Sequence, residues 1–108
     1  MAFYQNSDLI YEYTITIKSD ENVENQIVGV EFVLGENEEI KKYYPSNSVE
    51  KPVDGVYHIH FTQNDTILLP TGVIPTQANV KFRSGHIIPT NIVYVDVKRN
   101  LSKKVWVE

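Results

Sequence analysis

Apolar and polar residues alternate along most of this chain, and a period of two predicts β-strands with one buried face. The clearest run is Leu9–Lys18. One face of it holds Tyr11, Tyr13, Ile15 and Ile17, and the other holds Glu12, Thr14, Thr16 and Lys18. We therefore predict a long, half-exposed first strand over these residues.

The same period recurs at Gln26–Leu34 and at Val56–Thr62, which predicts two further strands. Glu39–Tyr44 is a shorter candidate that contains two lysines and is followed by Pro45. Lysine and proline are typical of edge strands, because they discourage pairing with another chain. We interpret this segment as an edge strand and the residues after it, Ser46–Gly55, as a turn-rich connection.

The stretch Gln77–Val97 predicts two strands that face each other across a turn at Arg83–His86. The apolar faces of its two arms consist of Ala78, Val80 and Phe82 and of Val93, Val95 and Val97. Between this stretch and the strand before it, Gln63–Pro70 breaks the alternation. There Asn64 or Asp65 can cap a single helical turn over Thr66–Leu69, and a short strand is the alternative.

About seven short strands, separated by Gly, Pro and Asn and without a long amphipathic helix, predict an antiparallel β-sandwich or small barrel. An immunoglobulin-like sandwich is the preferred topology, built as one domain over residues 1–108. The predicted core consists of Tyr11, Ile15, Val30, Phe32, Tyr57, Ile59, Phe61, Val80, Phe82, Val93 and Val95.

The composition excludes several classes of function and of partner. The net charge of −4 argues against nucleic-acid binding, which needs a basic surface. No apolar run approaches the roughly 20 residues that a membrane-spanning helix requires. Cysteine is absent, which excludes disulfides and thiolate chemistry, and no secretion signal follows Met1. We expect a protein that is made and folded in a cytoplasm, with no nucleic-acid or membrane partner.

His58 and His60 are the one pair with metal-ligand spacing, because residues two apart on a strand share a face. A third ligand would come from His86, Asp65 or Asp54. The pattern has a partial resemblance to the metal-binding cupins, although Lys81-Phe82-Arg83 replaces their second motif. The preferred interpretation is two solvent-side histidines without a metal or other cofactor.

Other chemistry finds little support in the residues. No Ser-His-Asp or Cys-His arrangement is present, and the carboxylates cluster in polar loops, where a pKa suited to acid–base catalysis is not expected. Seven tyrosines suggest carbohydrate binding, since aromatic rings stack on sugars. Tyr11, Tyr13 and Tyr57 fall on inward strand faces, however, so we predict that the tyrosines mainly fill the core.

The second half of the chain resembles small structural proteins of bacteriophages that infect Gram-positive bacteria. The similarity rests on 61–70 (FTQNDTILLP), 76–83 (TQANVKFR), 88–97 (IPTNIVYVDV) and 101–105 (LSKKV). Some of those proteins are grouped with the N-terminal, virion-anchoring domain of baseplate upper proteins. The resemblance implies a virion component of the head, neck, tail or baseplate and transfers no site residues.

We therefore predict a non-enzymatic virion structural protein, made in the bacterial host cytoplasm, that mediates assembly with other virion proteins or with further copies of itself. A carbohydrate-binding module and a small metal-dependent barrel enzyme that uses His58 and His60 are the alternatives. The predicted interface consists of the apolar residues near the two ends and an unpaired strand edge. Those end residues are Phe3, Tyr4, Val105, Trp106 and Val107.

Overall fold

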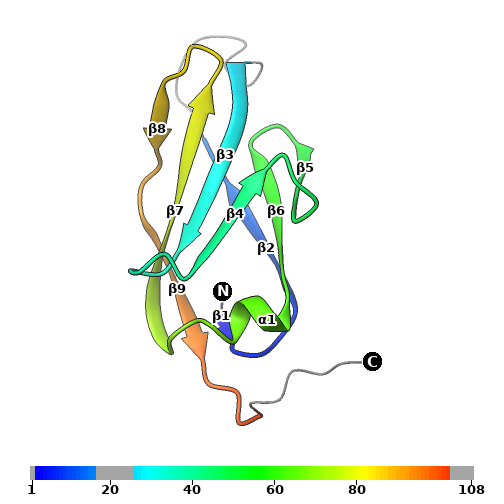
Figure 1. Cartoon of the computed structure of the whole chain (residues 1–108), viewed down its shortest axis with the longest axis vertical. Coiled ribbons are helices and arrows are strands. Elements are labelled where there is room, and N and C mark those ends of the chain that lie inside the picture. Colours follow the sequence, from blue (N-terminus) through cyan, green and yellow to red (C-terminus); the bar gives the residue numbers. More distant parts are fainter. Residues whose placement is uncertain (1, 17–25, 103–108) are drawn as a thin grey trace.

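A computed structural model describes residues 2–16 and 26–102, which form a two-layer β-sandwich with nine strands and one helical turn (Figure 1). The strands are β1 (Ala2–Tyr4), β2 (Leu9–Thr14), β3 (Ile27–Leu34), β4 (Ile40–Tyr44), β5 (Val49–Val53), β6 (Val56–Phe61), β7 (Gly72–Phe82), β8 (Ile87–Pro89) and β9 (Val93–Lys98). The helix α1 (Gln63–Thr66) lies between β6 and β7. The all-β class predicted from the alternation is confirmed.

The strand order is immunoglobulin-like. The smaller sheet has the order β2-β6-β5, which is that of the B, E and D strands. The larger sheet has the order β1-β9-β7-β3-β4, in which β9, β7, β3 and β4 take the places of G, F, C and C′. β8 pairs with the far end of β7, and β1 runs parallel to β9 while every other pairing is antiparallel.

The core lies between the two sheets and is rich in aromatic rings. Tyr13 packs edge-on against Phe32, with ring centroids 5.4 Å apart, and Phe32 in turn contacts Tyr57 at 5.4 Å. Phe3 adds an edge-on contact to Tyr11 at 5.2 Å. Edge-to-face pairs of this kind stabilise a core beyond the area they bury. These rings join both sheets into a single core.

The helical turn starts earlier than expected, because Thr62 is its N-cap. The Asp65 carboxylate accepts a hydrogen bond from the Thr62 backbone N–H at 2.9 Å, which completes a capping box. It also accepts a hydrogen bond from Lys42 Nζ of β4 at 2.8 Å. Burial works to raise the pKa of Asp65, but these hydrogen bonds outweigh it and hold the pKa below its usual range.

Several details of the sequence interpretation are wrong. Val93, which was predicted for the core, is 46% exposed, and a bulge between Ile27 and Gly29 interrupts the alternation at the start of β3. The turn-rich segment contains β5, whose Lys51-Pro52 interrupts the alternation. Phe82 packs against the core without being fully buried. The other predicted core residues are buried, namely Tyr11, Ile15, Val30, Phe32, Tyr57, Ile59, Phe61, Val80 and Val95.

Candidate binding groove at a free sheet edge

One edge of the smaller sheet is open. β2 pairs with β6 on one side, and no strand of residues 2–16 or 26–102 pairs with its other side. The Ile15 N–H donates to Gly55 O at 2.8 Å, so odd-numbered residues of β2 bond toward β6. By the alternation of antiparallel pairing, the N–H and C=O groups of Glu12 and Thr14 point away from β6. They can accept a further strand.

The other edge strands of the described chain carry features that discourage pairing. β4 contains Lys41 and Lys42, and β5 contains Lys51 and Pro52. β1 and β8 are only three residues long, and β8 ends in Pro89. β2 differs from all of these, because its six residues include neither lysine nor proline. The charge of Glu12 is turned toward β6, where its Oε1 lies 3.2 Å from His58 Nε2.

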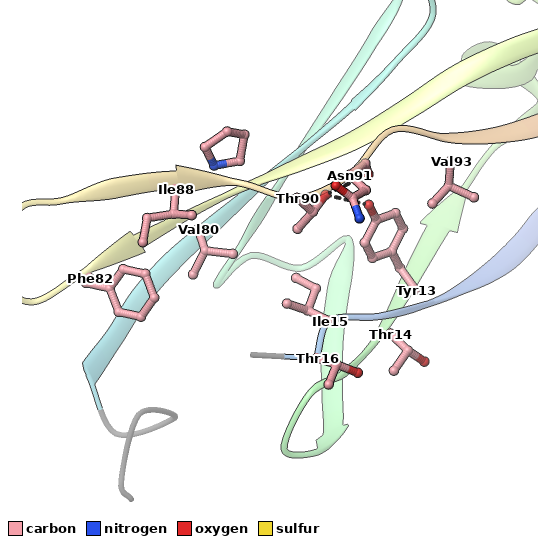
Figure 2. A pocket seen from close by; sticks show the side chains of 11 residues that line it. Tyr13, Thr14, Ile15, Thr16, Val80, Phe82, Ile88, Thr90, Asn91 and Val93 are labelled. Carbon is pink, nitrogen blue, oxygen red and sulfur yellow. Dashed lines mark hydrogen bonds between the residues drawn. The ribbon is translucent and has the colours of Figure 1, made fainter. Parts of the chain in front are cut away.

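A groove of about 480 Å³ runs beside this free edge, between β2 and the β8 segment (Figure 2). We call it the β2–β8 groove. Its lining consists of Tyr13, Thr14, Ile15, Thr16, Val80, Phe82, Ile88, Pro89, Thr90, Asn91 and Val93. Apolar side chains therefore alternate in it with hydroxyl and amide groups. It has the size of a small binding pocket, and it adjoins backbone that is free to pair.

Hydrogen bonds around Thr90 hold the groove in shape. The Thr90 hydroxyl lies 2.9 Å from the Tyr13 hydroxyl and accepts from the Ala78 N–H at 3.1 Å. Gln77 Nε2 donates to Thr90 O at 2.8 Å, and the Thr90 N–H donates to Ala78 O at 2.8 Å. The segment after β8 is thus attached to β7 and, through Tyr13, to the other sheet, so the groove exists before a partner arrives.

Two of the predicted interface residues, Phe3 and Tyr4, lie on β1 and do not line the β2–β8 groove. Phe3 is fully buried against Tyr11 and Phe61, so the expectation that its side chain is free to bind a partner is wrong. Its neighbour Tyr4 is 51% exposed and remains available. Val105, Trp106 and Val107 lie outside the described residues, and their role stays a prediction.

The structure does not assemble the three-ligand metal site considered from the sequence. His58 and His60 do face outward from β6, but the candidate third ligands are engaged elsewhere. Asp65 pairs with Lys42, Asp54 lies 3.7 Å from Lys51, and His86 lies in the turn between β7 and β8. As the side chains lie, no group of three potential ligands converges in the described part of the chain.

The exposed tyrosines lie mainly on the outward face of the larger sheet. Tyr43 and Tyr94 are 51% and 61% exposed. Between them, Asn79 Nδ2 donates to Glu31 Oε1 at 3.1 Å. Two shallow hollows of about 290 and 350 Å³ share Glu31 and Asn79. Tyr11, Tyr13 and Tyr57 are buried, as predicted.

Comparison with known proteins adds no relative: neither a protein family nor a curated protein matches this chain. Within the described residues, no helix is long and apolar enough to cross a membrane.

Proposed function

We propose that this chain is a non-enzymatic structural protein of a bacteriophage virion, which joins other virion proteins by accepting a strand of a partner at β2. The observation that carries the proposal is the unprotected edge of β2 beside the β2–β8 groove. Natural sheets rarely leave such an edge open, because it templates pairing with other chains. An open edge next to a groove that contains apolar side chains is therefore a feature of a protein that binds an extended segment.

Strand addition explains how the two features would work together. The main-chain groups of Glu12 and Thr14 would supply the hydrogen bonds that give affinity. A strand that covers the six residues of β2 spans roughly 20 Å. Every second side chain of the added strand points to one face, so apolar residues at alternate positions would enter the groove near Ile15 and Ile88. The groove thus favours a partner segment with period-two apolar residues.

The virion context is supported by the resemblance of residues 56–107 to small phage structural proteins. The non-enzymatic part is supported by the sequence, in which no Ser-His-Asp or Cys-His arrangement of catalytic residues is found. Mass spectrometry of purified virions tests the context, and absence of the chain from particles would disprove it. Sedimentation of the isolated protein then separates self-association from attachment to a larger scaffold.

The strand-addition mechanism has a direct test in Thr14→Lys, which places a charge at the free edge. The matched control is Thr71→Lys, at an exposed position in the connection before β7. Both variants should keep their circular dichroism spectrum and melting temperature. Thr14→Lys should no longer enter particles or bind the partner, whereas Thr71→Lys should behave as the wild type. Equal incorporation of the two variants would show that β2 is not the docking edge.

Carbohydrate binding is a second candidate, favoured by the exposed Tyr43 and Tyr94 on either side of Glu31 and Asn79. Aromatic faces and amide or carboxylate groups are what sugars contact. A glycan array with wild type and Tyr43→Ala tests it. Binding that is lost in the variant would support this function, and an array without any signal would exclude it for the glycans presented.

A further inference from the structure

The outward face of the smaller sheet carries two histidines and two glutamates that come from all three of its strands. His58 and His60 lie on the central strand β6, where residues two apart share a face. Glu12 of β2 and Glu50 of β5 are the cross-strand partners of His58 on its two sides. We call these four residues the His–Glu cluster. Its backbone is held on paired strands, so the four side chains start from fixed positions.

Each imidazole in the His–Glu cluster already contacts one carboxylate. His58 Nε2 lies 3.2 Å from Glu12 Oε1, and His60 Nε2 lies 2.5 Å from Glu50 Oε1. The histidine side chains are 36% and 39% exposed, and both glutamate side chains are 66% exposed. The cluster thus consists of two separate His–Glu pairs, and its side chains are open to solvent and able to turn without disturbing the core.

The donor set of the His–Glu cluster selects a class of ligand. Imidazole nitrogens suit zinc, copper and nickel ions, and carboxylate oxygens complete such sites. With neutral imidazoles the two carboxylates give the cluster a charge of about −2, which a divalent cation would neutralise. Carboxylates that hydrogen-bond to imidazoles are also the usual outer partners of metal-bound histidines.

We propose that the His–Glu cluster binds one divalent transition-metal ion, with His58, His60 and Glu50 as ligands and Glu12 as the residue that orients His58. Binding exchanges the hydrogen bond between His60 and Glu50 for bonds to the ion, and rotation of these exposed side chains brings the three ligands together. Calcium and magnesium are not expected to bind, because they prefer sites made of oxygen ligands. This site is separate from the β2–β8 groove and does not depend on the proposed function.

Isothermal titration of the full chain with zinc chloride tests the proposal. The chain has three histidines and no cysteine, so His86→Ala is a matched control for His58→Ala and His60→Ala. Wild type and His86→Ala should bind one zinc ion per chain with equal affinity. His58→Ala and His60→Ala should each bind at least about tenfold more weakly, and Glu12→Gln about 10- to 100-fold more weakly. Calcium chloride should give no binding heat.

A second measurement, the melting temperature, checks that the heat seen in the titration comes from zinc binding to the folded chain. Zinc should raise the melting temperature of the wild type in a concentration-dependent manner, because a ligand that binds only the folded state stabilises it. The His58→Ala/His60→Ala double variant should melt at the same temperature with and without zinc. Absence of saturable one-to-one binding, unchanged binding in that double variant, or equal binding of calcium would each overturn the proposal.

Discussion

The hydroxyl of Tyr13 on β2 lies 2.9 Å from the hydroxyl of Thr90 after β8, and this hydrogen bond joins the two sheets beside the β2–β8 groove. Thr90 also accepts the Ala78 N–H, which belongs to a fully buried residue of β7. The Thr90 side chain thus forms hydrogen bonds to a strand of each sheet. The hydrogen bonds to Tyr13 and Ala78 are unequal in importance, because the Tyr13 hydroxyl borders the groove while the Ala78 N–H has little access to water.

Thr90→Val should therefore destabilise the protein more than Tyr13→Phe. Thr90→Val leaves the buried Ala78 N–H without a hydrogen-bond partner, which costs about 1–3 kcal/mol. Tyr13→Phe removes one hydrogen bond worth about 0.5–1.5 kcal/mol. Urea unfolding of both variants measures the difference, with Thr71→Val as an exposed control that should change little. Equal losses for the two variants would mean that the Tyr13–Thr90 hydroxyl pair, which both changes remove, holds the groove and that the Ala78 contact adds little.

Asp65 should make the stability of the protein depend on pH in the acid range. Its pKa in the folded protein lies below the ordinary value of 3.8, so its contribution to stability is complete above that value. The contribution is lost as the pH falls through the lower folded pKa. The wild type should therefore lose stability below about pH 4 more steeply than Asp65→Asn. At pH 7 this variant should be less stable by about 1 kcal/mol, through its weakened cap.

Chemical unfolding at several pH values measures this dependence. Asp54→Asn serves as the control, because Asp54 is an exposed carboxylate that also lies near a lysine, at 3.7 Å. Its acid profile should follow that of the wild type. Parallel profiles for wild type and Asp65→Asn would contradict the role given to the capping box and the Lys42 ion pair.

The alternation of apolar residues was enough to predict most of the strands, because a strand with one face in a core has apolar residues at every second position of its own sequence. β2, β3, β6 and β7 all show it. β5 does not, since Lys51 and Pro52 interrupt its pattern, and Val93 carries the pattern but lies beside the groove, where the second sheet does not cover it. Local pattern reports burial only where a neighbouring layer is present.

The candidate site was harder to predict, because it depends on which strands lie next to each other. β2 shows its lack of lysine and proline in the sequence, but nothing local reveals that it is an edge strand. For the same reason the burial of Phe3 could not be predicted from the sequence. Its three-residue strand has no periodicity, and its burial follows from parallel pairing with β9, more than ninety residues away, in the register Phe3 to Val97.

Phe61→Ala tests the core between the sheets. Phe61 is 2% exposed and contacts Phe3 with ring centroids 5.6 Å apart, so its truncation should cost about 3–5 kcal/mol. Tyr43→Ala, on the outward face, should change stability by less than about 0.5 kcal/mol. Urea denaturation followed by circular dichroism distinguishes the two. Similar losses for both variants would mean that the outward face of the larger sheet is also covered.

The neighbours Phe3 and Tyr4 give the sharpest division between core and surface, because adjacent residues of one strand point to opposite faces. Phe3→Ala should destabilise the protein by about 3–5 kcal/mol, since it leaves a cavity against Tyr11 and Phe61. Tyr4→Ala should leave the melting temperature nearly unchanged, because Tyr4 is about half exposed to solvent.

If Tyr4 contacts a partner, the same variant should weaken incorporation into particles by tenfold or more, as truncation of an interface tyrosine often costs about 2 kcal/mol. A stable Tyr4→Ala protein that assembles normally would remove Tyr4 from the interface and leave β2 as its remaining described part.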